Sequence, residues 1–282
     1  MLLDIALDTV KDSVKVLPFL FLAYLFIEWM EKRTEEKNLA WVHAAGRWGP
    51  VLGGALGVIP QCGFSAATAN LYAGGVITRG TLLAVFLSTS DEMLPILLSR
   101  NAPTAFIGKV LLFKLACGMA AGVTVDAVEQ RLNRGRRKQI HDFCEQEHCH
   151  CEDGVLLPAL RHTGKIFLFL LLVSFALALA VETLGAEKLA SFVLNRPVWG
   201  ELLAGIIGLI PNCAASVIIT ELYLSGGMSA GAMASGLLVG AGVGVLVLCR
   251  MERDWKDNLL TIALLYGWGV AFGLLAELLP IF

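Results

Sequence analysis

The segment Gly57-Val-Ile-Pro-Gln-Cys62 recurs 151 residues later as Gly208-Leu-Ile-Pro-Asn-Cys213, and this repetition decides the fold. Around it, residues 48–75 align with residues 199–226 without a gap and share 12 identities in 28 positions. Tryptophan, proline and cysteine all fall in phase, which random apolar sequence does not produce. The chain is therefore an internal duplication, and repeats of this kind are typical of transporter folds.

The composition indicates that the duplicated chain lies in a lipid bilayer. Of its 282 residues, 56% are hydrophobic and 16% are charged, against about a quarter in an average soluble domain. Residues 48–78 and 222–249 contain no Asp, Glu, Lys or Arg, and a helix needs about 20 apolar residues to cross the hydrocarbon core. We expect an all-α polytopic membrane protein. A soluble enzyme and a disordered protein are excluded, and so is a nucleic-acid binder, because the net charge is −2 and no basic face is present.

Each half contains the same predicted parts. Its last span carries a pair of glycines four residues apart, Gly118/Gly122 and Gly269/Gly273, which predicts a close approach of helices. The predicted parts are a first span at 14–31 and 165–182, a glycine-rich element at 48–75 and 199–226, a third segment at 80–99 and 231–249, and a last span at 104–127 and 258–279.

The glycine-rich element admits two topologies, because Pro60 and Gly63 both weaken a helix. It is either one broken span or a re-entrant helical hairpin. Basic residues cluster at 32–47, 131–138 and 250–256, and only the hairpin puts all three clusters in the cytoplasm, as the positive-inside rule demands. Each half then has three full spans plus a hairpin. We therefore predict two inverted repeats with ten helical segments in total.

The same pattern divides the chain into repeat 1 at 1–130, a cytoplasmic linker at 131–162 and repeat 2 at 163–282. Acidic residues at Asp4, Asp8 and Asp12 leave the amino terminus without the positive charge of a signal peptide. Residues 14–31 are accordingly predicted to be a mature span. We expect a multi-pass protein of the inner (plasma) membrane.

The two repeated turns are the first candidate site. Non-helical backbone is tolerated at membrane depth only inside protein or along a water-filled cavity, so the turns are predicted to converge near the midplane. Helix ends, amide oxygens, thiols and hydroxyls would bind an ion there. The alternative is a pair of breaks with small packing residues. The candidate substrate-binding residues of the turns are Gln61, Cys62, Ser65, Asn212, Cys213 and Ser216.

Asp91 and Glu92 are acids inside a predicted span, where acids are costly and usually face a cavity. The aligned positions of the second half are Gly242 and Val243, so the fold does not require the acids. We predict that one acid ligates a cation while the other exchanges protons. The alternative is a solvated helix cap. The hydroxyl groups predicted to lie beside the pair belong to Ser88 and Ser90.

Five further polar positions lie within or next to apolar runs. Asn70 and Glu221 are aligned and are both candidate substrate-binding residues, and Glu221 is predicted to be either a ligand or proton relay or an interfacial charge. Lys114 falls inside a predicted span, where it is expected to pair with an acid. Asp126 and Glu277, which are also aligned, are predicted to be interfacial charges near span ends.

The linker contains a cluster of thiol and imidazole side chains, which bind zinc, copper and similar ions. Its spacing matches no standard zinc finger. We predict a loop that captures or senses metal, and the alternative is an incidental polar linker. The candidate metal ligands of the cluster are Cys144, His148, Cys149, His150 and Cys151.

The motifs at 57–65, 87–95 and 210–213 resemble those of the ten-transmembrane heavy-metal exporter family, which is similar to the organoarsenical permeases. The resemblance covers nearly the whole chain and implies five segments per half. Members of the family carry labels of arsenic efflux or manganese transport. The positions matched by motif are Pro60, Gln61, Cys62, Ser65, Ser90, Asp91, Glu92, Pro211, Asn212, Cys213 and Ser216.

The sequence thus predicts a secondary active transporter rather than an enzyme. It would export a divalent metal cation such as manganese by alternating access, driven by protons or the membrane potential, since no Walker-type phosphate-binding loop is present. Carboxylates suit Mn²⁺, whereas the thiols of Cys62 and Cys213 suit arsenite or a soft metal, which is the first alternative. A permease for an oxyanion or sulfur anion and an ion channel are the others. The expected partners are the lipid bilayer, the metal ion and protons, with no resident cofactor, and homodimerisation stays open.

Overall fold

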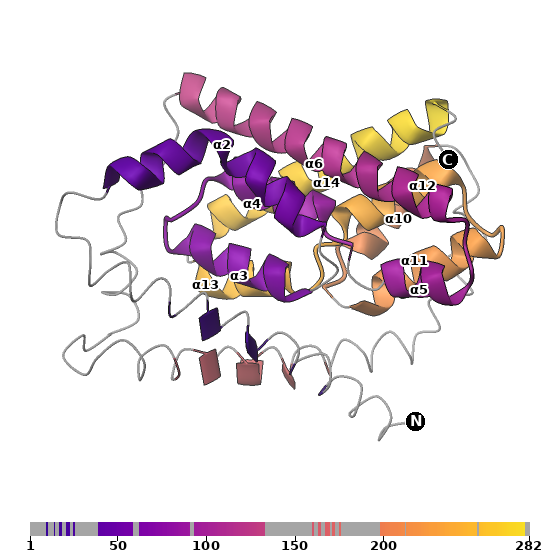
Figure 1. Ribbon diagram of the computed structural model, residues 1–282, viewed down its shortest axis with the longest axis horizontal. Coiled ribbons are helices and arrows are strands. Elements are labelled where there is room, and N and C mark those ends of the chain that lie inside the picture. The colour runs from indigo at the N-terminus through magenta and orange to yellow at the C-terminus, as the bar shows by residue number, and fades with distance from the viewer. Residues whose placement is uncertain are drawn as a thin grey trace.

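The computed structural model describes residues 39–58, 62–90, 93–132, 198–211, 213–252 and 254–279, with scattered positions at 10–25 and 160–175. These residues form helices and turns, with no strand among them (Figure 1). The predicted first spans at 14–31 and 165–182 lie mostly outside the described residues, and so does the cysteine and histidine cluster of the linker.

Ten helices are described, five from each half of the chain (Figure 1). Among the described residues, four stretches are long and apolar enough to cross a membrane, namely 79–99, 104–131, 230–251 and 255–278, which confirms the predicted third segments and last spans. The helices of the first half are α2 (Leu39–Gly57), α3 (Cys62–Ala73), α4 (Arg79–Ser88), α5 (Met93–Ser99) and α6 (Thr104–Arg131). Those of the second half are α10 (Trp199–Gly208), α11 (Cys213–Leu224), α12 (Ala230–Val239), α13 (Gly244–Met251) and α14 (Trp255–Leu278).

The third segment of the first half is interrupted, whereas the sequence predicted a continuous helix over 80–99. α4 ends at Ser88 and α5 begins at Met93. The Ser88 hydroxyl donates to the Ala84 carbonyl at 2.8 Å, and the Thr89 hydroxyl donates to the Val85 carbonyl at 2.7 Å. Such side-chain bonds compete with the backbone ladder and bend helices.

The third segment of the second half is interrupted at the aligned place, between Val239 and Gly244. Gly242 adopts a left-handed conformation with φ of 54°, which only glycine adopts at little cost. The prediction of one helix over 231–249 therefore also needs correction. Both segments are pairs of short helices placed end to end.

The interrupted segments form the centre of the molecule. Every residue of 80–88 and 231–239 is buried. By contrast, α6 and α14 expose large apolar side chains such as Leu112 and Leu278, which are 67% and 80% exposed. A face of this kind is suited to lipid contact.

The same set of packings occurs in both halves. α2 and α6 pack against α4, and α10 and α14 pack against α12. A Cβ atom added to Gly122 of α6 would lie 2.5 Å from the Gly80 carbonyl oxygen, and one added to Gly273 of α14 would lie 2.9 Å from that of Gly231. These contacts confirm the close helix approach predicted from the glycine pairs.

The two halves pack against each other at several places, among them the contacts of α4 with α12 and α14. α3 packs against α13, and α11 packs against α5. Within the hydrophobic core, Leu82 and Phe86 of α4 belong to the same cluster as Leu238 and Leu248. Neither half therefore encloses its own core.

The direction of the helices follows from their contacts. Gly49 approaches Thr81 and Gly57 approaches Ser88, so α2 and α4 run the same way. Tyr72, near the end of α3, accepts a hydrogen bond from Arg79 at the start of α4. α3 therefore returns toward the end of the molecule at which α4 begins, which we call the Arg79 end.

The helices α10 and α12 of the second half begin at the opposite end of the molecule. Gly231, at the start of α12, approaches Glu201 of α10, and Gly208 approaches Gly236. α10 and α12 accordingly run the same way. The residue Arg100 follows α5 and bonds to Glu221 of α11, so we call this the Arg100 end.

Candidate functional site

The helix interruptions of the two halves meet at one side chain, Lys114 of α6. Its ammonium group donates to the backbone carbonyl of Thr89, directly after α4, and to that of Leu237 in the last turn of α12, the latter at 2.6 Å. The Lys114 side chain is only 3% exposed. The carboxyl-terminal ends of two helices thus surround one positive charge.

This arrangement is suited to a cation. The unsatisfied carbonyl groups at the end of a helix carry a partial negative charge, and α4 and α12 bring two such ends together. A lysine inside an apolar span is costly unless it has partners of this kind. The sequence predicted an acid as the partner of Lys114, and the described partners are these backbone carbonyls.

Four short helices begin beside the same place. Ser65, in the first turn of α3, is fully buried, and a Cβ atom added to Gly244 at the start of α13 would lie 2.8 Å from the Ser65 Cβ. α11 packs against α5, and Glu221 near the end of α11 bonds to Arg100 just after α5. Because α3 begins at Cys62 and α11 at Cys213, both repeated turns lead into these helix starts.

Only some of the predicted site residues lie at the helix interruptions in the described part of the chain. Ser88 and Ser90 are buried at the first interruption, where the Ser90 hydroxyl donates to the Ser88 carbonyl at 3.3 Å. Asn70 is fully buried in α3, and Ser216 is half-buried in α11. Gln61, Asp91, Glu92 and Asn212 lie outside the described residues, and Cys62 and Cys213 are described by their backbone alone.

Glu221 lies at the far end of α11, away from the interruptions. Its carboxylate accepts two hydrogen bonds from the Arg100 guanidinium, at 2.9 and 3.0 Å. Both side chains are well exposed, and an exposed ion pair contributes about 1 kcal/mol or less. The pair connects α11 to the end of α5.

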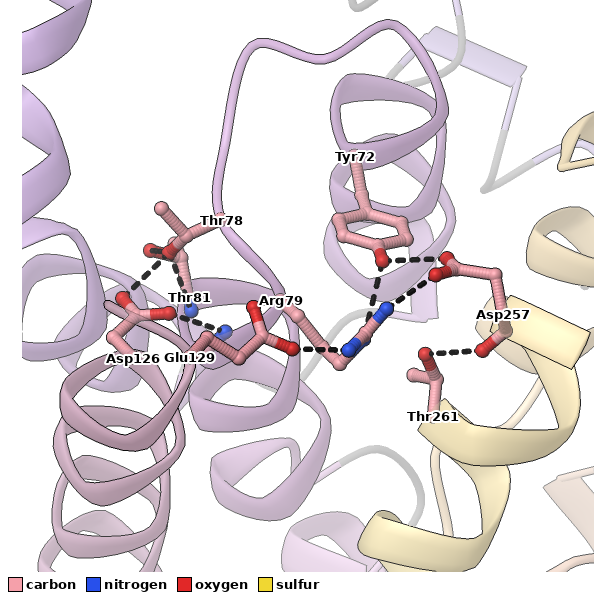
Figure 2. Close-up of polar contacts among 9 residues, drawn as sticks. Tyr72, Thr78, Arg79, Thr81, Asp126, Glu129, Asp257 and Thr261 are labelled. Carbon is pink, nitrogen blue, oxygen red and sulfur yellow. Dashed lines mark hydrogen bonds and ion pairs between the residues drawn. The ribbon is translucent and has the colours of Figure 1, made fainter. Parts of the chain in front are cut away.

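A polar cluster that the sequence did not predict closes the Arg79 end. Figure 2 shows the Arg79 guanidinium between the carboxylates of Glu129 and Asp257, with ion pairs to both. The Tyr72 hydroxyl donates to Asp257 at 2.6 Å and accepts from Arg79 at 3.2 Å. The cluster connects three helices of the first half to α14 of the second.

Asp126 and Glu277 each accept a hydrogen bond from a backbone amide in the first turn of a central helix, α4 and α12 respectively. The Gly80 amide donates to Asp126 at 2.9 Å, and the Gly231 amide donates to Glu277 at 2.7 Å. An acid at a helix amino terminus is stabilising. Asp126 also accepts from the Thr78 hydroxyl at 2.7 Å, as Figure 2 shows.

The aligned contact at the Arg100 end is aromatic rather than ionic. Tyr223 corresponds to Tyr72, and Phe106 corresponds to Asp257. The rings of Phe106 and Tyr223 stack with centroids 5.6 Å apart and planes 6° from parallel. Each end of the molecule is therefore closed by a tyrosine against the first turn of a long span.

Comparison with known proteins identifies one family. The family described as "Putative, 10TM heavy-metal exporter" matches residues 2–192, which is more than half of the chain. No curated protein and no solved structure matches the chain. The matched region includes the first repeated turn, the interruption after α4 and Lys114. The chain belongs to this family of heavy-metal exporters and is a multi-pass membrane protein.

Proposed function

We propose that the protein is a secondary active transporter that exports a divalent metal cation, such as Mn²⁺, across the inner membrane by alternating access. The observation that supports this proposal most is the junction at Lys114, where carbonyl groups from both halves surround a buried positive charge. A place that stabilises an ammonium group inside the bilayer also suits a metal ion.

The carboxylates of the proposed site are those of Asp91 and Glu92. These are the two residues that join Ser90 to the start of α5, so they follow the α4 interruption directly in the chain. Oxygen ligands of this kind suit Mn²⁺. In the proposed cycle Lys114 balances their charge when no metal is bound, and protons or the membrane potential drive export.

The proposed topology is two inverted repeats, 1–130 and 163–282, with a re-entrant hairpin in each. The parallel course of α2 and α4 and the return of α3 toward Arg79 support the first hairpin. The cytoplasmic linker would lie at the Arg79 end, because α6 ends there. In alternating access the Arg79 cluster and the Phe106–Tyr223 stack would open in turn.

The test is transport in proteoliposomes. We expect an imposed proton gradient to accumulate Mn²⁺ against its own gradient, and Asp91→Asn or Glu92→Gln to abolish this with folding intact. Normal transport by both variants would rule out the acidic site. A flux that only equilibrates Mn²⁺ would identify a channel instead.

A second candidate is export of arsenite or transport of a sulfur-containing anion. It is supported by the fact that α3 and α11 begin at Cys62 and Cys213, because thiols are soft ligands and helix amino termini bind anions. For this candidate we expect Cys62→Ser to abolish arsenite tolerance in cells or thiosulfate uptake in proteoliposomes. Loss of these with retained Mn²⁺ transport would establish separate thiol and carboxylate sites.

A further inference from the structure

Glu201, in the first turn of α10, is a buried acid without a described partner. The side chain is 0% exposed, and neither of its carboxylate oxygens has a hydrogen-bond donor within the described part of the chain. An ionised carboxylate in this situation costs several kcal/mol unless a positive charge compensates it.

A second acid borders the same space. A Cβ atom added to Gly231 would lie 2.8 Å from the Glu201 Oε1 and 2.8 Å from the Glu277 Oε2. Both oxygens lie 2.8 Å from this one point beside Gly231, so they are at most about 5.6 Å (twice 2.8 Å) from each other. Glu277 has one donor there, the Gly231 amide.

Within the part of the chain that the structure describes, the helices that pack most extensively against α10 supply no cation at this place. They are α11, α12 and α14, and among their residues the only basic one is Lys256, in the first turn of α14, at the opposite end of that helix from Glu277. In the first half, Asp126 is aligned with Glu277 and lies close to the positive charge of Arg79. In the second half the residue aligned with Arg79 is Ala230, which carries no charge.

The duplication shows that the fold does not need Glu201. The aligned residue of the first half is Pro50, which packs beside Gly122 without any charge. Asp126 alone accepts the amide at the start of α4. The second half therefore carries an acid that the fold does not require, at a place where an uncompensated charge is destabilising.

We propose that Glu201 and Glu277 bind a divalent cation at the Arg100 end. Two carboxylates match the charge of such an ion, and their oxygens suit a hard ion such as Ca²⁺ or Mn²⁺. The site is separate from the helix interruptions, because Gly231 lies about 14 Å along α12 from Gly240 at 1.5 Å per residue. It does not depend on the transport site proposed above.

The test is cation-dependent thermal stabilisation of the purified full-length protein at constant pH, after treatment with a chelator. Ca²⁺ is the preferred probe, because thiols and imidazoles bind it poorly. We expect a saturable rise of the melting temperature in the wild type. Glu201→Gln and Glu277→Gln should each weaken the apparent affinity about tenfold or more, as ligand charge is lost.

A matched control comes from the first half. Asp126→Asn removes the acid aligned with Glu277 and should leave the Ca²⁺-dependent rise unchanged, whatever it does to the starting melting temperature. In metal-free buffer, Glu201→Gln should melt no lower than the wild type, because it removes an uncompensated charge. A purely structural Glu201 would show the opposite.

Two outcomes would overturn the proposal. One is a Ca²⁺ response that survives in both Glu201→Gln and Glu277→Gln. The other is a wild type that is stabilised by lower pH and not by Ca²⁺ or Mn²⁺, which would mean that the acids share a proton. Repeating the Ca²⁺ titration in Asp91→Asn distinguishes this site from the proposed transport site, since stabilisation that depends on Glu201 should persist in that variant.

Discussion

Among single residues, Lys114 carries the sharpest prediction. Lys114→Met keeps the length of the side chain but removes the donor to the Thr89 and Leu237 carbonyls. Leaving buried carbonyls unsatisfied should cost about 2–3 kcal/mol, and Mn²⁺ transport should be lost. Melting temperature and flux in proteoliposomes measure the two effects. Lys109→Met is the control, since Lys109 is exposed on the same helix, and equal effects of both variants would contradict the role of Lys114.

Comparing the aligned residues of the two halves finds some of the candidate site residues and misses others. The acids at Asp91 and Glu92 stand out because their counterparts are Gly242 and Val243. The same comparison shows that Glu201 is aligned with the uncharged Pro50, so the sequence alone also distinguishes this acid. The contact of Arg79 with Asp257 gives no such signal, because the two residues are 178 positions apart and meet only in the folded chain.

Among the helices, the glycine contacts of α6 are testable by substitution. Gly122→Ala places a methyl group against the Gly80 carbonyl, which belongs to a buried helix and has little room to move. We expect a loss of about 1–3 kcal/mol in the free energy of unfolding, measured by denaturant titration in detergent. Gly108→Ala on the same helix has nothing within 4 Å and should be neutral or stabilising. Similar losses in both variants would contradict the assignment of the loss to the contact with Gly80.

The positions of the spans follow from hydropathy, but their interruptions do not. In the second half, Gly240, Gly242 and Gly244 indicate a weak point in retrospect. In the first half the interruption depends on hydroxyl groups that bond back to the preceding turn, as Thr89 does. Serine and threonine also occur inside intact helices, so this pattern alone does not distinguish a break from a packing face.

For the whole molecule, the unlike closures at the two ends predict opposite responses. Arg79→Gln removes the ion pairs to Glu129 and Asp257, so amide hydrogen exchange should rise at the Arg79 end, in residues 72–82 and 255–261. Phe106→Ala should instead raise exchange at the Arg100 end, in the segment around Tyr223. If each variant loosened both ends equally, the two closures would not be separate gates.

The crossed packing of α3 with α13 and of α5 with α11 has a consequence for biosynthesis. α3 and α5 leave the ribosome long before their partners exist. At about 5–20 residues per second, the 178 residues from the end of α3 to the end of α13 take roughly 9 to 36 seconds. During that time Lys114 also lacks the Leu237 carbonyl. The first half therefore enters the bilayer as an incomplete body, exposed to membrane chaperones and proteases, and its survival in the cell depends on prompt arrival of the second.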